Sequence, residues 1–249
     1  MKTPAVLIVA AMSFLGIIPA GLAGCEAKGM KASEVFQDRA TIEMADAAQA
    51  GDAARVQAAA RAGANPNAQG KDGATPLAFV LATTVNKRGL AALLASGADP
   101  NLPTVNKATP MSLATRAKDP ELLRLFLKAG GNPNLHNDEG LPLLGLAARD
   151  QRWENVETLL TAGADINAAD EGGYTTVMQV ALLRQYDHVV WLLNHGADPR
   201  PVSKIGDSLP AIVADGALPA NHPLYASRNQ VIEMLRARGY NIALPPQQH

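Results

Sequence analysis

Apolar and polar positions follow a pattern along most of the chain that returns about every 33 residues. Each period ends at a glycine, and a branched apolar residue stands seven positions before it. The glycines are Gly63, Gly97, Gly130, Gly163, Gly196 and Gly239, at intervals of 34, 33, 33, 33 and 43 residues. A period of this length indicates that each unit is one supersecondary element, which buries its apolar face only against its neighbours. The pattern therefore predicts an elongated stack of repeats over residues 41–242.

Each unit is predicted to contain a turn followed by two helices. Asp72-Gly73 is a tight-turn dipeptide, Thr75 can cap a helix with its hydroxyl group, and Pro76 then stands at the first helical position. The second helix of this unit ends at Gly97, which can adopt the left-handed conformation that terminates helices. The Asp and Asn side chains that follow the glycine can satisfy backbone groups in the turn.

The two ends of the array depart from the pattern, as terminal caps do. Most middle units have two large apolar residues before the glycine, whereas the first unit has Ala59-Ala60 and the last has Leu235-Arg236. The last interval is ten residues longer than the standard one. We predict an insertion at about residues 200–226, where the sequence is rich in proline, and a disordered tail at residues 243–249.

The recurrent motifs resemble the ankyrin repeat. They include Thr75-Pro76-Leu77, Thr109-Pro110-Met111, Leu141-Pro142-Leu143 and the ending Gly163-Ala164-Asp165-Ile166-Asn167. The resemblance implies an all-α repeat solenoid of about six units, including degenerate caps, in which helix-loop-helix units are joined by β-turn fingers. Ala78, Ser112 and Leu144 stand where the family usually has a histidine. This departure weakens a turn hydrogen bond without altering the expected fold.

The composition suits thin helical layers and excludes one class of partner. Apolar residues make up 47% of the chain and aromatic residues only 4%, so the core must consist mainly of small and branched side chains. The 22 basic and 23 acidic side chains almost balance, which leaves no basic footprint for a nucleic acid. We expect a protein that is monomeric on its own and binds no nucleic acid.

The amino terminus predicts export. Lys2 is followed by an apolar stretch from Ala5 to Ile18, which is shorter than the roughly 20 residues needed to span a bilayer as a helix. A charged start, an apolar middle and a small-residue end are typical of a signal peptide. Leu22-Ala23-Gly24-Cys25 resembles the lipobox of bacterial lipoproteins, which implies a signal peptide at residues 1–24 and lipidation of Cys25. The alternatives are an ordinary signal peptide with an incidental cysteine, or a short buried helix.

The lipoprotein interpretation has consequences for location and stability. Acyl chains on Cys25 would hold the protein at a membrane surface, with residues 25–40 as a flexible tether. Glu26 stands where aspartate is the familiar signal for retention in the inner membrane, so the sequence favours a periplasmic protein anchored to the outer membrane. Cys25 is the only cysteine, so the fold has no disulfide and must be stabilised by packing.

No catalytic or metal-binding motif emerges from the sequence. His188 and His195 are seven residues apart and could share a helical face, but no carboxylate or cysteine is spaced to complete a metal site. The chain contains no nucleophile elbow and no glycine loop that could hold a phosphate. We therefore predict a protein that is not an enzyme and carries no metal and no cofactor.

Candidate binding residues lie at the turn tips and at an equivalent position in two of the repeats. The tips are Lys71-Asp72, Asn106-Lys107, Asp138-Glu139 and Asp170-Glu171, of which the last two are doubly acidic. Trp153 and Tyr186 occupy equivalent positions ten residues before a glycine, and Tyr174 lies beside the fourth tip. Aromatic side chains next to charges are typical of interface anchors. The alternative is that both aromatic residues fill the layer between helices while the acids only solvate the turns, and Trp191 is interpreted as packing at the core edge.

These observations lead to a ranked set of functions. The first is a lipid-anchored periplasmic module that binds and neutralises a protein partner. Small exported ankyrin lipoproteins resemble immunity proteins against type VI secretion effectors, including phospholipases, so a secreted lipase is the most specific partner that this resemblance implies. The second is an envelope scaffold or assembly partner, for example of an oxidative-stress enzyme. An enzyme is the third.

Overall fold

The computed structural model describes residues 29–215 and 218–242, whose helices belong to two compact units. The boundary between the units falls between Asn132 and Pro133. The predicted signal peptide, Cys25 and the predicted tail at residues 243–249 lie outside the described residues. No helix in the described ranges is long and apolar enough to cross a membrane.

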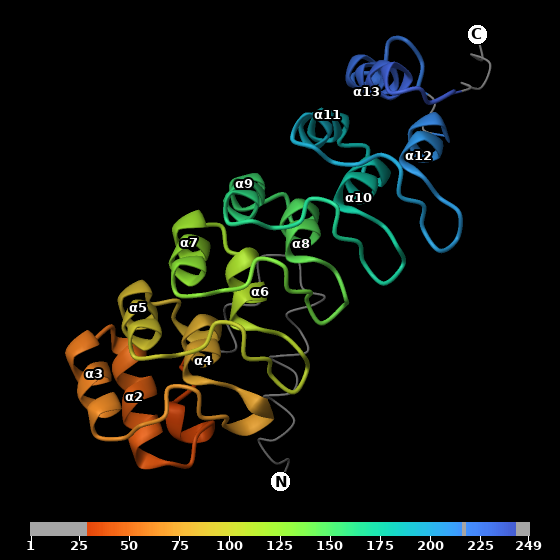
Figure 1. Ribbon diagram of the computed structural model, residues 1–249. Coiled ribbons are helices and arrows are strands. Elements are labelled where there is room, and N and C mark those ends of the chain that lie inside the picture. The colour runs from red at the N-terminus through yellow and green to blue at the C-terminus, as the bar shows by residue number, and fades with distance from the viewer. Residues whose placement is uncertain (1–28, 216–217, 243–249) are drawn as a thin grey trace. The chain divides into compact units, whose positions relative to one another are not determined.

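Each unit consists of three pairs of antiparallel helices (Figure 1). Unit 1 begins with the short 3-10 helix η2 (Ala32–Glu34). Its pairs are α2 (Arg39–Ala50) with α3 (Ala53–Arg61), α4 (Pro76–Thr83) with α5 (Lys87–Ala95), and α6 (Pro110–Thr115) with α7 (Pro120–Lys128), and the 3-10 turn η3 (Lys71–Gly73) precedes α4.

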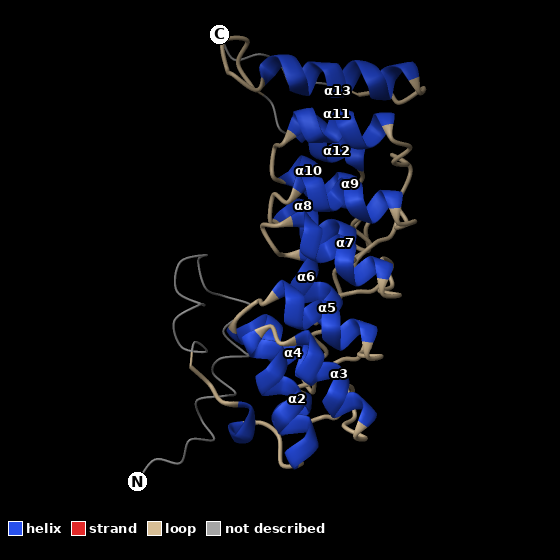
Figure 2. Ribbon diagram, turned by 90° about the vertical axis from the view of Figure 1, so that its left-hand side faces the viewer, coloured by secondary structure: helices blue, strands red, loops and turns tan. Residues whose placement is uncertain are grey.

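Unit 2 repeats this arrangement. Its pairs are α8 (Leu143–Arg149) with α9 (Trp153–Thr161), α10 (Thr176–Leu182) with α11 (Tyr186–Asn194), and α12 (Leu209–Asp215) with α13 (Tyr225–Ala237). Within each unit the first helices of successive pairs pack on one another, and Figure 2 shows the helices in layers. The described residues contain isolated β-bridges but no strands, so the predicted all-α solenoid of six helical pairs is confirmed.

The α-helices of unit 1 begin where the sequence supplies caps, whereas α8 to α11 and α13 in unit 2 begin without a side-chain cap. Thr75 Oγ1 accepts a hydrogen bond of 3.2 Å from the backbone amide of Ala78. Thr109 and Ser112 form a reciprocal capping box at the start of α6. Ser112 occupies one of the positions where the ankyrin pattern has histidine, so at this repeat a serine supplies the hydrogen bond that we expected to be weakened. Gly97 ends the second pair with a φ of 91°.

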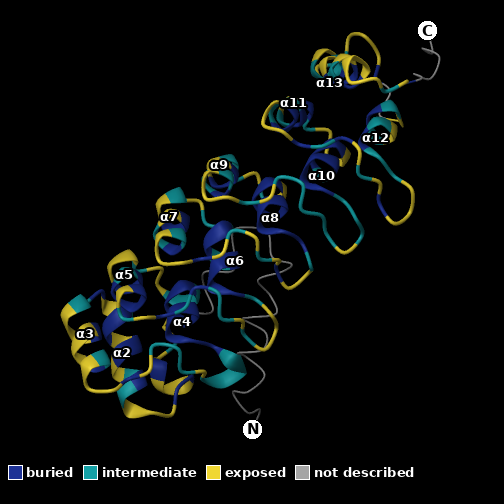
Figure 3. Cartoon of the chain, in the orientation of Figure 1, coloured by how far each residue is buried: buried dark blue, intermediate teal, exposed yellow. Residues whose placement is uncertain are grey.

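The repeat register agrees with the packing. All six branched residues that stand seven positions before the glycines are buried between helices, as Figure 3 shows for the helix interiors in dark blue; they are Val56, Leu90, Leu123, Val156, Val189 and Ile232. Within each unit the second helices that carry them pack on one another, α3 on α5 and α5 on α7 in unit 1 and α11 on α13 in unit 2, as a stacked array requires.

Asparagine side chains fasten each repeat to the next within a unit. Asn67 Nδ2 donates to the carbonyl oxygen of Gly97 at 2.9 Å, and its Oδ1 accepts from the amide of Asp99 at 2.7 Å. Asn101 makes the same pair of bonds in unit 1, and Asn134 makes it in unit 2. These bonds join loops 29 to 32 residues apart in the sequence, whereas sequence reasoning assigned the asparagines only to their own turn.

The predicted tether at residues 25–40 is wrong for the part that the structure describes. Val35 and Phe36 are buried, and the Phe36 ring meets Phe79 edge-on with centroids 5.7 Å apart. The amide of Lys71 donates to the carbonyl of Val35 at 2.9 Å. These contacts bury apolar surface on the first repeats, so the segment is part of the fold. Helix α2 begins at Arg39 because the Asp38 carboxylate caps it.

The predicted insertion at about residues 200–226 is narrower than expected. Helix α12 begins 33 residues after α10, so the array is regular up to this point. The extra length follows Asp215, because nine residues separate α12 from α13, against three between α10 and α11, and α13 has 13 residues against nine in α11. Of the four prolines in the predicted segment, Pro219 and Pro223 therefore fall in the insertion, whereas Pro201 and Pro210 belong to the regular array.

Arg228 holds the lengthened last pair together. Its side chain is only 2% exposed, and its guanidinium donates to the carbonyls of Val213 and Ala214, both at 3.0 Å. These carbonyls lie in the last turn of α12, where backbone oxygens lack helical partners and a positive charge is favoured. The buried charge is thus matched to the end of a helix.

The register of the repeat predicts that Leu160 is buried, but the structure places it half-exposed and buries Leu159 fully. We therefore expect Leu159→Ala to lower the free energy of unfolding by about 2–5 kcal/mol because it opens a cavity in a packed layer. Leu160→Ala, the adjacent control, should cost about 1 kcal/mol. Urea denaturation followed by circular dichroism measures both, and a loss for Leu160→Ala as large as or larger than that for Leu159→Ala would contradict this assignment of the buried position.

Candidate functional site

The loops that precede the first helices of unit 2 form three fingers, at residues 137–141, 170–174 and 203–207. The first side chain of each finger accepts hydrogen bonds from amides within the same finger. Asn137 Oδ1 accepts from Glu139 and Leu141, Asp170 Oδ1 from Gly172 and Tyr174, and Ser203 Oγ from Asp207, at 2.8 to 3.1 Å. We call the exposed side chains of these loops the finger face.

The four predicted acidic residues have different roles. Asp138, Glu139 and Glu171 are exposed on the finger face, and Glu139 pairs with Arg149 from α8. Such exposed ion pairs contribute about 0–1 kcal/mol, so this pair leaves the acidic tip available. Asp170 is half-buried, and its Oδ2 also accepts from Gln179 Nε2 at 2.9 Å. We therefore correct its assignment from partner-binding residue to a residue that shapes the finger.

Tyr174 links two successive fingers. Its hydroxyl group donates to Asp207 Oδ2, and this hydrogen bond raises the pKa of Tyr174. The amide of Lys204 donates to the carbonyl of Gly172 at 2.9 Å, which adds a backbone link between the same fingers. The ring of Tyr174 remains half-exposed, so it can contact a partner only through its carbon edge.

The two aromatic residues at equivalent sequence positions differ in the structure. Tyr186 is only 1% exposed, so no partner reaches it, and its assignment as a binding residue is wrong. Trp153 is half-buried at the first position of α9, away from the finger tips. Its indole ring lies parallel to the His188 imidazole with centroids 3.6 Å apart. The same period therefore places one aromatic ring inside the core and the other at its edge.

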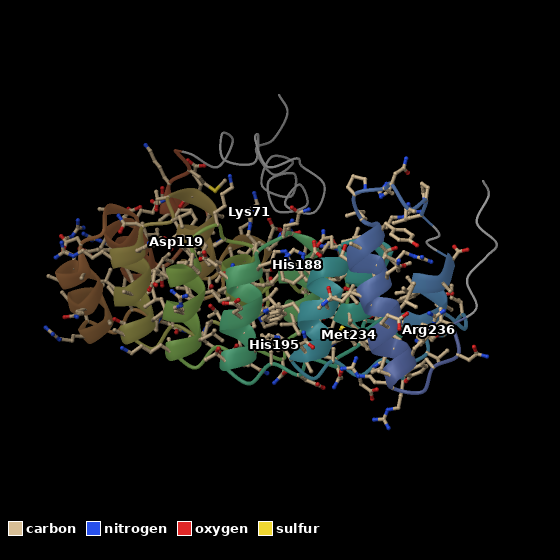
Figure 4. The ribbon with its side chains drawn as sticks, turned by 90° about the horizontal axis from the view of Figure 1, so that it is seen from above. Lys71, Asp119, His188, His195, Met234 and Arg236 are labelled. Atoms are coloured by element: carbon tan, nitrogen blue, oxygen red, sulfur yellow. The ribbon has the colours of Figure 1, made fainter. Side chains whose placement is uncertain are left out.

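His188 and His195, which the sequence could have placed on one helical face, each stack on a different tryptophan. His188 stacks on Trp153 and His195 stacks on Trp191, the latter with centroids 3.7 Å apart (both histidines are labelled in Figure 4). Trp191 is half-buried and lies at the edge of the core, as predicted. Across residues 29–215 and 218–242, no three histidine, cysteine or carboxylate side chains gather as a metal site would require.

Sequence reasoning missed the apolar side chains of the last finger. Ile205 at its tip is 80% exposed, and Val202 at its base is also exposed. Val202 occupies the position of His136 and Ala169 in the earlier fingers, since the three begin equivalent β-bridges. His136 Nε2 lies 3.4 Å from the carbonyl of Ala169 in the following finger. The period itself could have predicted that Val202 is exposed, because no further finger follows the one at residues 203–207 to cover it.

The charges divide unequally between the units. Residues 29–132 carry 12 basic and nine acidic side chains, and residues 133–242 carry eight basic and 13 acidic ones. The formal net charges are therefore +3 and −5. In unit 1 the finger at residues 104–108 exposes Val105 and Lys107, in contrast to the acidic tips of unit 2.

The comparisons with known proteins identify the fold. Residues 111–202 match the family model described as ankyrin repeats in three copies. The structure resembles that of the ankyrin repeat protein EF0377, with a TM-score of 0.64 and 24% identity over 80% of this chain and 98% of that one. This chain has an ankyrin-repeat fold. The ankyrin repeat domain of Bcl-3, a member of the IkappaB family, is similar with a TM-score of 0.67 and 22% identity over 81% of this chain and 88% of that one. None of the curated proteins matches the chain.

Ankyrin repeats are typical of protein-interaction scaffolds that are generally not enzymes, and this class of function fits the exposed finger face. Asp138, Glu171 and Ile205 are exposed finger side chains that lie outside the hydrogen bonds described above.

The Trp153–His188 stack should make unit 2 sensitive to pH. Burial lowers the pKa of His188 from its ordinary value of 6.5, against a smaller opposing effect of Asp187. The unfolded chain therefore binds the proton more readily than the folded chain, so the free energy of unfolding should fall as the pH drops below about 6.5. Urea denaturation at pH 7 and pH 5.5 measures this slope, which should be smaller in His188→Gln. An unchanged slope in that variant would contradict the assignment.

Proposed function

We propose that this chain is a protein-binding module whose recognition surface is the finger face of unit 2. The observation that carries the proposal is that Asp138, Glu171 and Ile205 are exposed on adjacent fingers without a role in folding. An acidic rim beside apolar side chains is a composition that suits a protein partner with a basic surface. The rigid helical pairs beneath the fingers keep these groups in place, which limits the entropy lost on binding.

A finer proposal concerns location and role. We infer that signal peptide cleavage before Cys25 and acylation of that residue anchor the protein in the periplasm, at the outer membrane. The module then neutralises a protein that attacks the membrane, as an immunity protein against a type VI secretion effector such as a phospholipase. An effector that hydrolyses lipid must reach the bilayer surface, where a tethered inhibitor has a high effective concentration. The lipobox residues and the resemblance to exported ankyrin lipoproteins support this proposal.

The alternative role is that of an envelope scaffold or assembly partner, for example for an oxidative-stress enzyme. The same finger face and the same lipobox residues serve this role equally well. The neighbouring gene separates the two: a lipase or other toxin gene favours the immunity role, whereas a catalase or envelope-assembly gene favours the scaffold.

Deleting the gene tests the immunity role directly. Cells that lack it should lose viability beside siblings that deliver the neighbouring effector, and a plasmid copy of the parent chain should restore survival. A copy with Cys25→Ser should protect less well, because the inhibitor is then no longer concentrated at the membrane. Equal survival with and without the gene would exclude the immunity role but leave the scaffold role open.

Charge reversal on the finger face tests the binding surface. The double variant Asp138→Lys and Glu171→Lys should slow association with the captured partner at least tenfold at low salt, a loss of about 1.4 kcal/mol, and should reduce the salt dependence. Glu154→Lys with Glu157→Lys is the matched control, because it makes the same charge change at exposed positions of α9 in the same unit. Surface plasmon resonance measures both rates. Equal slowing by the two double variants would place the contact elsewhere.

A further inference from the structure

One edge of unit 1 brings the start of the described chain next to the loop between α4 and α5. Gln49 Nε2 donates to the carbonyl oxygen of Met30 at 3.3 Å and to Thr83 Oγ1 at 2.9 Å. The carbonyl of Gln49 in turn accepts from Asn86 Nδ2 at 3.3 Å. Met30 and the loop at residues 84–86 are therefore fixed to the same glutamine, so the first described residues lie beside this loop.

Val85 in this loop combines strain with exposure. Its φ is 50°, and its side chain is 47% exposed. The equivalent loop positions in unit 2 are Gln151 and Arg184, which have the same left-handed conformation with unbranched polar side chains. A β-branched residue is disfavoured in this conformation, and apolar exposure gains nothing for folding. Strained residues that persist on a surface are candidates for a role outside folding.

Exposed basic side chains occur on the segments next to the loop that carries Val85 and in the equivalent loop of the next repeat. Lys31 stands next to Met30, Arg88 lies in the first turn of α5, and Lys118 precedes α7. Lys87 pairs with Asp119, which is labelled in Figure 4, and the same carboxylate caps α7 by accepting from the amide of Glu121. Asp52, another acid at this edge, likewise caps α3. Asp52 and Asp119 are therefore engaged with helix ends, whereas Glu34, three residues after Lys31, is exposed. The unit as a whole has an excess of three positive charges.

The distance along the chain limits how far this edge can lie from a lipid anchor. Cys25 precedes Met30 by five residues, which span at most about 18 Å when fully extended. This upper limit is slightly more than two Debye lengths of about 8 Å at physiological salt, so any path shorter than the fully extended one brings the edge to where its charges act on the membrane that holds the anchor. The burial of Val35 and Phe36 in the fold, in place of a long tether, is what makes this distance short.

We propose that the edge formed by Lys31, Val85, Arg88 and Lys118 docks on the anionic phospholipid headgroups of the membrane that holds acylated Cys25. The inference rests on the lipid anchor of the proposed function. The basic side chains contact the phosphate groups, and Val85 inserts its apolar side chain at the boundary between headgroups and acyl chains. The strain at Val85 is then retained for membrane contact, and the finger face of unit 2 is left to the protein partner.

Vesicle sedimentation with the unacylated protein tests this directly, because neither the anchor nor a partner takes part. The mature chain with Cys25→Ser should bind vesicles of equal parts phosphatidylcholine and phosphatidylglycerol at low ionic strength. It should bind vesicles of phosphatidylcholine alone at least tenfold more weakly, and added salt should release it. Failure to bind the anionic vesicles, or equal binding to both kinds, would overturn the proposal while leaving the partner-binding function untouched.

A charge-matched pair of variants locates the docking edge. Arg88→Glu with Lys118→Glu should weaken binding to the anionic vesicles roughly 30-fold, on the basis of about 1 kcal/mol for each basic side chain near an anionic surface. Arg61→Glu with Lys128→Glu makes the same charge change in unit 1, at the opposite ends of α3 and α7, and should weaken binding less than fivefold. Equal weakening by both pairs would show a response to net charge alone and would overturn the assignment of this edge.

Val85→Asn separates membrane contact from folding. Asparagine tolerates the left-handed conformation, so the variant should have an equal or higher melting temperature than the parent. It should nevertheless bind the anionic vesicles severalfold more weakly, because the apolar contact is lost. Unchanged vesicle binding would contradict the role of Val85.

Discussion

The structure depends on the burial of one repeat's apolar side chains by the next repeat. No pair of helices could bury Leu90 or Val189 completely by itself, so stability comes from contacts between neighbouring pairs. Asparagine side chains reinforce these contacts by bonding the loop of one repeat to the loop of the next, as Asn134 does with Gly163 and Asp165. These contacts involve the helices and the loops that follow the second helices, so the side chains at the finger tips are not part of the core.

The fingers show how folding and recognition share a small set of residues. The first side chain of each finger accepts hydrogen bonds from amides of its own turn. Asp170 is therefore structural, although its neighbour Glu171 is exposed. The hydroxyl group of Tyr174 donates to Asp207 and so links two successive fingers. The finger face of unit 2 is therefore an acidic surface with apolar side chains on its last finger, whereas unit 1 has a net positive charge. This division suits a protein in which one unit faces lipid and the other faces a partner.

Departures from the repeat carry more information than the repeat itself. Gln151, Arg184 and Val85 occupy the same left-handed loop position, but only Val85 brings strain and apolar exposure to it. Trp153 and Tyr186 are likewise equivalent in register, yet one stacks on His188 at the edge of the core and the other is enclosed. In both cases the repeat places residues at equivalent backbone positions, and the type of side chain determines whether the residue is strained, exposed or buried there.

Local propensity and a regular period are enough to predict the repeat, its helical pairs, the caps of unit 1 and the six buried branched residues. They also predict that the acidic tips of the fingers lie in turns. Contacts in the folded molecule, which the period does not specify, pack Phe36 on Phe79, bury Leu159 rather than Leu160, and make Tyr186 inaccessible. Each of these depends on which way a side chain points relative to a neighbouring repeat. A period fixes the spacing of residues along the chain, but the direction and depth of a side chain are set by the atoms it meets.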